Sequence, residues 1–166
     1  MVRITARITG LSESKLARFV SRAKRAAKLQ GEVHVLVTTD SDLRRLNQRF
    51  RGKDKATDVL SFPAVSVGKN GLAGDVAISA QMARENAQRL GHTVAQEVEI
   101  LALHGILHLA GYDHEIDRGE MAAREARLRR ALGLPLALIQ RNSRQVAKPR
   151  KPARSRSFRA TARVSR

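Results

Sequence analysis

Four short stretches of the chain have the apolar pattern of β-strands. The first two alternate apolar with polar residues, which is the period of a strand with one buried face. The third is stopped by Pro63, and the fourth follows a glycine-rich turn. The predicted strands are residues 2–8, 33–37, 59–62 and 74–79.

Apolar residues that recur every three or four positions predict five helices. Ser12 is placed to cap the first helix, and we expect Ser41 or Asp42 to cap the second. Thr93 and Gln96 have the spacing of a capping box at the start of the fourth helix. The predicted helices are residues 13–29, 42–50, 81–90, 94–110 and 118–132.

The fourth predicted helix is apolar on nearly every side, which is typical of a helix buried in the middle of a domain. Strands and helices interleave irregularly, with no internal repeat and no linker. We therefore predict an α+β fold: a single domain over residues 1–140, with a mixed sheet of about four strands packed around this central helix.

Composition adds a strong positive charge. The 166 residues include 32 Lys or Arg against 15 Asp or Glu, a formal net charge of +17, which points to RNA, DNA or anionic lipid as a partner. With no cysteine, any metal must be held by histidines and carboxylates. No apolar run approaches the ~20 residues that span a bilayer, and the first residues do not resemble a signal peptide, so we expect a cytoplasmic protein with no membrane partner.

Ten of the basic residues and none of the acidic ones lie in residues 141–166. This composition cannot bury enough surface to offset the entropy of ordering, and we predict a disordered tail. It is either an arm that binds nucleic acid by neutralising phosphates or a solubilising extension, and we favour the arm.

Three histidines fall within eleven residues at the end of the central helix: His104, His108 and His114. Residues four apart on a helix differ by about 40° in direction and about 6 Å in height, so the first two rings share one side. Gly111 can reverse the chain and return the third ring. Three imidazoles that leave a fourth tetrahedral position open are typical of a catalytic zinc site, which predicts one Zn²⁺; Ni²⁺, Co²⁺ or Fe²⁺ also suit such a site. His34 and His92 have no such spacing, and we interpret both as incidental.

The histidine spacing is that of the long zincin signature, with one departure. Where those proteases carry a general-base Glu, this chain has Gly105, which argues against peptide hydrolysis. Glu97 lies two turns earlier and is too far away to replace it. The acids around His114 either orient the imidazoles or form an exposed acidic turn; they are Asp113, Glu115 and Asp117.

A metal site in a positively charged protein suits a phosphodiester better than an amide. The non-bridging oxygens gain charge in the transition state, and a guanidinium grips two oxygens at once. The charged loop that starts at Arg51 supplies candidates for this role, although a solvated surface loop would have the same composition.

Three segments together resemble the YbeY family of bacterial endoribonucleases, also called rRNA maturation factors. They are HGILHLAGYDH (104–114), LNQRFRGKDKATDVLSFP (46–63) and GDVAIS (74–79), and the resemblance covers essentially residues 1–140. It implies a single-strand-specific, metal-dependent endoribonuclease that processes ribosomal RNA, notably the 3′ end of 16S rRNA, and acts in late ribosome quality control. It also implies that His104, His108 and His114 bind zinc and that Arg51 is the catalytic arginine. The basic tail is outside the family pattern.

We therefore expect a zinc-dependent endoribonuclease whose partners are single-stranded RNA and the ribosome. A non-enzymatic, RNA-binding assembly factor with a structural metal is the main alternative, and a metalloprotease is a weaker one.

Overall fold

The computed structural model describes residues 1–65, 71–113 and 116–136. The strands there are β1 (Val2–Ile4), β2 (Glu32–Thr38), β3 (Val59–Pro63) and β4 (Leu72–Ser79). The helices there are α1 (Glu13–Ala27), α2 (Asp40–Arg51), α3 (Ala80–Leu90), α4 (Val94–Leu109) and α5 (Glu120–Leu132). The predicted tail, residues 141–166, lies outside the described residues.

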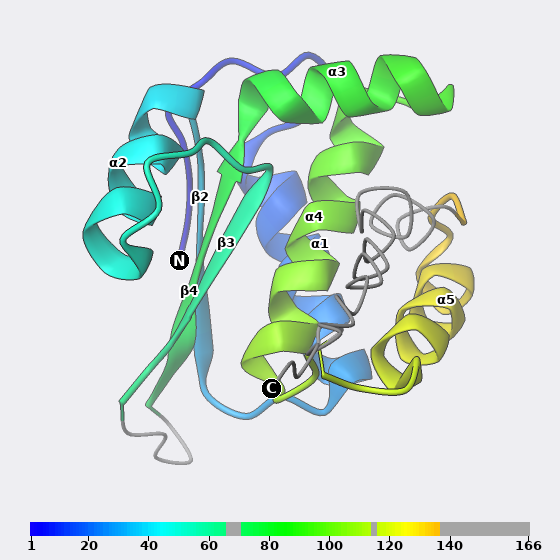
Figure 1. Cartoon of the computed structure of the whole chain (residues 1–166). Helices are drawn as coiled ribbons and strands as arrows, with labels where there is room; N and C mark the ends of the chain where they lie inside the picture. The colour runs from blue at the N-terminus through cyan, green and yellow to red at the C-terminus, as the bar shows by residue number, and fades with distance from the viewer. Residues whose placement is uncertain (66–70, 114–115, 137–166) are drawn as a thin grey trace, which may run out of the picture.

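The four strands form one mixed sheet in the order β1-β2-β4-β3. The first three pair in parallel, and β3 runs antiparallel to β4 at the edge. Helix α2 covers one face of the sheet, while α1 and α4 cover the other, with α5 packed outside them (Figure 1). The predicted α+β domain, with its mixed sheet and central helix, is confirmed.

Alternation along the strands builds a core on each face of the sheet. Val76 and Ile78 of β4 join the main core beneath α1 and α4, whereas Ala77 joins a small core with Leu43 and Leu60 beneath α2. Most of α4 is buried, as its continuous apolar composition predicts. Its start is held by the expected capping box of Thr93 with the residue three positions later.

Two predicted boundaries are wrong. Thr39 caps α2 in place of Ser41 or Asp42: its hydroxyl accepts a hydrogen bond from the backbone N–H of Asp42, which already lies in the first turn. Strand β1 ends at Ile4 and does not reach residue 8, because β2 ends at Thr38 and leaves no partner for the following residues. None of the described helices combines the length and the apolar character needed to cross a membrane.

Candidate metal centre

His104 and His108 point their rings at each other from consecutive turns of α4. Their Nε2 atoms are 3.2 Å apart, and the ring planes meet at 76°. Two nitrogens bound to one tetrahedral zinc ion at 2.0–2.1 Å would lie about 3.3–3.4 Å apart. The two rings are therefore as close as a shared ion requires.

Glu125 of α5 fixes the orientation of the first ring. Its Oε2 lies 2.8 Å from His104 Nδ1, and both side chains are largely buried. An ionised carboxylate can only accept, so Nδ1 carries a proton and Nε2 is the nitrogen left to bind a metal. This is the nitrogen that faces His108, and a carboxylate behind a ligating histidine is the usual support of a metal site.

Glu125 also pairs with Arg129, one turn further along α5. The Oε1–Nη2 distance is 2.5 Å, and the two side chains are 1% and 2% exposed. Burial raises the pKa of the Glu125 carboxyl, but its hydrogen bonds and electrostatic interactions with His104 and Arg129 together outweigh burial and hold that pKa below its ordinary value. The carboxylate is thus kept ionised inside the protein.

Sequence reasoning missed Glu125, although a signal for it was present. Met121 and Leu128 mark the buried side of α5, and Glu125 occupies the matching helical position between them. A carboxylate in an otherwise apolar stripe has to be paired when it is buried. Its partner, however, lies 21 residues away on another helix, and no local pattern identifies that residue.

Gly105, at the position of the zincin general base, lies against the sheet. A Cβ on this residue would lie 2.6 and 2.9 Å from the two methyl groups of Val76 and 3.1 Å from Ser61 Oγ. The Ser61 hydroxyl also donates to the Gly105 carbonyl at 3.3 Å. No side chain fits there unless α4 moves away from β4, which gives a packing reason for the glycine and leaves no room for a glutamate.

His114 and Glu115 lie outside the described residues. Within residues 1–65, 71–113 and 116–136, no group of three His, Cys, Asp or Glu is placed to hold one ion. The third ligand is therefore still a prediction. Asp117 accepts hydrogen bonds from the backbone N–H groups of Gly119 and Met121, so this acid caps the start of α5.

Arg51 is the last residue of α2 and is exposed. Because α2 and α4 lie on opposite faces of the sheet, an extended substrate that reached both Arg51 and His104 would pass over the edge strand β3 (Figure 1). The fold is compatible with Arg51 as the catalytic arginine, and this role stays a prediction.

His92, interpreted from sequence as incidental, has a buried partner. Its Nε2 lies 2.6 Å from Glu97 Oε2, and the two side chains are 6% and 0% exposed. This pair joins the end of α3 to the first turns of α4. Glu97 therefore interacts with His92, and its distance along α4 from His104 already argued against a role at the metal centre.

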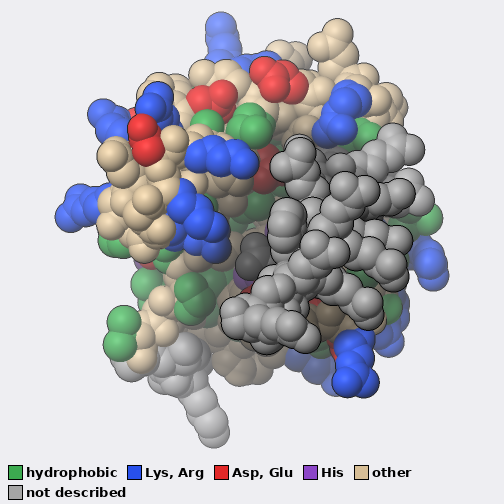
Figure 2. Space-filling view, in the orientation of Figure 1, with side chains coloured by type: hydrophobic (Ala, Val, Ile, Leu, Met, Phe, Trp, Pro, Cys, Tyr) green, Lys and Arg blue, Asp and Glu red, His purple; other side chains and the backbone are tan. Residues whose placement is uncertain are grey.

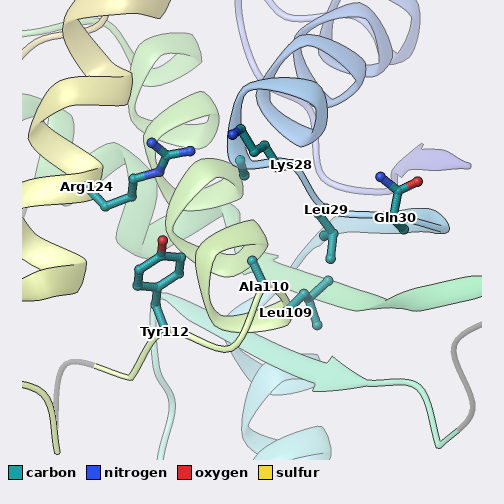
Figure 3. A pocket seen from close by; sticks show the side chains of 8 residues that line it. Lys28, Leu29, Gln30, Leu109, Ala110, Tyr112 and Arg124 are labelled. Atoms are coloured by element: carbon teal, nitrogen blue, oxygen red, sulfur yellow. The ribbon is translucent and has the colours of Figure 1, made fainter.

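A separate hollow of about 510 Å³ opens where α1 and α4 end. Lys28, Tyr112 and Arg124 lie around it (Figure 3), and neither His104 nor His108 lines it. We therefore place the candidate site at the paired histidines and not at this hollow.

Known proteins of one family match most of this chain. The family model described as Endoribonuclease YbeY matches residues 4–133. A Koribacter versatilis protein named Endoribonuclease YbeY is 52% identical over 151 residues, which cover 91% of this chain and 97% of that protein. A Helicobacter pylori protein of the same name is 45% identical over 109 residues, or 66% of this chain and 77% of the other.

A solved structure has the same fold. The solution structure of a Thermotoga maritima protein superposes with a TM-score of 0.53 at 29% identity, covering 91% of this chain and 99% of that one. Since the family model spans most of the chain and these relatives are 52% and 45% identical over the aligned residues, this chain belongs to the endoribonuclease YbeY family.

Proposed function

We propose that this protein is a zinc-dependent endoribonuclease that cleaves single-stranded RNA. Its substrate is ribosomal RNA, including the 3′ end of 16S rRNA, and it acts in late ribosome quality control. Membership of the family supports the endoribonuclease activity. The observation that carries the metal dependence is the 3.2 Å approach of His104 and His108 through their Nε2 atoms, with Glu125 behind the first ring.

In this proposal His104, His108 and His114 hold one Zn²⁺. When bound, the ion would supply a Lewis acid for the scissile phosphate. Glu125 keeps the proton of His104 on Nδ1, so the ring stays a neutral donor through Nε2. Gly105 lets the helix that carries both histidines pack closely against Val76 of β4.

Arg51 binds the phosphate that gains charge during cleavage. It lies in the segment from Arg44 to Lys55, which contains six Lys or Arg and one Asp. Figure 2 shows Lys and Arg side chains gathered over α2. A guanidinium offers two parallel hydrogen bonds to phosphate oxygens, and this positive surface attracts RNA from a distance.

Elemental analysis of the purified protein, together with a cleavage assay on single-stranded RNA, tests this function. We expect about one zinc ion per chain, cleavage that a chelator abolishes, and recovery when zinc is added back. Cleavage that persists in the metal-free protein would contradict the proposal. Hydrolysis of casein that is sensitive to chelation would favour a protease, which the crowded position of Gly105 opposes.

Arg51→Ala separates the enzyme from an assembly factor with a structural metal. We expect this variant to keep its metal and its melting temperature and to lose RNA cleavage. Arg25→Ala, at an exposed position on α1, removes the same charge away from the site and is the matched control. Undiminished cleavage by Arg51→Ala would remove this arginine from the mechanism.

A further inference from the structure

Phe50 is an exposed aromatic ring in a protein with few of them. The chain has four Phe, one Tyr and no Trp. Phe19 is 4% exposed in the core, whereas Phe50 in the last turn of α2 is 59% exposed. Because Phe50 is largely exposed, much of its ring surface is available to a ligand.

The exposed ring is part of an ordered aromatic pair. Its centroid lies 5.2 Å from that of Phe62 on β3, and the two planes are tilted by 58°. Phe62 in turn packs against the small core beneath α2. The guanidinium carbon of Arg49 lies 5.4 Å from the Phe50 centroid. The Phe50 ring is thus supported by the half-buried Phe62, and the Arg49 guanidinium lies over it.

The pair adjoins both parts of the proposed site. Arg51 follows Phe50 directly in the sequence. On the other side, Ser61 precedes Phe62 on β3 and donates to the Gly105 carbonyl, next to His104 on α4. The aromatic pair therefore lies at the edge strand that an RNA reaching both Arg51 and the histidines would cross.

We propose that Phe50 and Phe62 form a stacking platform for one unpaired base of the RNA substrate. An unstacked base lies on the open part of the Phe50 ring, while Arg49 and its basic neighbours neutralise the adjacent phosphates. Bases in a duplex are stacked on each other and cannot reach such a ring, so the platform favours single strands. This inference rests on the proposed function, since it names how that site holds its RNA.

The absence of tryptophan allows a direct test. Phe50→Trp places a single indole on the platform, and we expect a single-stranded 2′-O-methyl RNA to quench its fluorescence. An oligonucleotide with the same phosphates but no bases serves as the matched ligand and should leave the fluorescence unchanged. Gln88→Trp, at an exposed position on α3, is the control for unspecific quenching.

Affinity provides an independent measurement. Phe50→Ala should weaken binding of the single-stranded RNA by about 5- to 150-fold, the loss expected for one stacked base, while Phe50→Tyr retains binding. Both variants should bind the base-free oligonucleotide as the parent does.

Two results would contradict the stacking platform without contradicting the proposed nuclease activity. One is an unquenched Phe50→Trp protein that still binds RNA by anisotropy. The other is a Phe50→Ala protein with the parent's RNA affinity, which would assign the exposed ring to a protein partner. If the parent itself neither bound nor cut single-stranded RNA, the proposed function would fail and the platform with it.

Discussion

Replacing Glu125 with glutamine should weaken metal binding, although Glu125 is not one of the predicted ligands. Glu125→Gln keeps the shape of the side chain and an oxygen that can accept from His104 Nδ1, but it removes the negative charge. The ring then loses the charged partner that holds its tautomer and raises its basicity.

The expected magnitude follows from the contacts. Loss of such a supporting partner typically lowers metal affinity by about 10- to 100-fold, or about 1.4–2.7 kcal/mol. Stability also falls, because Arg129 is 2% exposed and loses the carboxylate 2.5 Å away. Breaking a buried ion pair costs about 3–5 kcal/mol, a large share of the 5–15 kcal/mol that stabilises a typical domain.

Arg129→Met is the control that separates the two effects. It breaks the same ion pair but leaves the Glu125 oxygen beside His104, so it should lose a similar amount of stability and less zinc affinity than Glu125→Gln. Zinc affinity is measured by competition with a colorimetric chelator, and stability by urea unfolding of the metal-free proteins. Measuring stability without metal keeps the binding energy out of the comparison.

Equal zinc affinity in Glu125→Gln and the parent would refute the argument. So would an equal loss of affinity in Glu125→Gln and Arg129→Met, since the defect would then follow from the weakened fold. In either case Glu125 would be a structural residue of the α4–α5 contact.

Three further predictions concern other parts of the chain. Gly105→Ala should lower the free energy of unfolding, measured in urea, by about 1–3 kcal/mol, because the new Cβ meets the methyl groups of Val76. This loss is expected although alanine is the better helix former. Adding Val76→Ala to the same chain should recover part of the loss, and purely additive effects of the two substitutions would exclude the clash. Hydrogen bonds from Thr38, Thr39 and Arg45 lower the pKa of the Asp42 carboxyl below its ordinary 3.8. The stability that this carboxylate contributes is therefore complete above that value and is lost as the pH falls through the lower folded pKa; Asp42→Asn should show a shallower acid dependence in urea unfolding, and an unchanged dependence would contradict the assignment. Deleting residues 141–166 should lower RNA affinity and flatten its salt dependence while cleavage at saturating RNA persists, and unchanged binding curves would leave the tail without this role.

The sequence predicted most of the fold because its elements are encoded locally. The capping box at Thr93, the alternation in β2 and the glycine after α3 each act over a few residues. The wrong prediction of the α2 cap also involves only a few residues. Thr39, Ser41 and Asp42 are all residue types that cap helices, and which of them caps α2 depends on where β2 ends.

The pairing of His104 with His108 was determined by the sequence alone, because four residues on a helix always return to the same side. Only the tertiary structure decided which residues contact the rings of His104 and Phe50. Glu125 reaches His104 from another helix, and Phe62 reaches Phe50 from an edge strand. Gly105 shows the same division: the sequence shows that a side chain is missing, and only the packing of α4 on β4 explains why none can be present. Periodicity carries information over a turn or two of chain, whereas contacts between distant segments depend on how whole elements pack to bury their apolar faces.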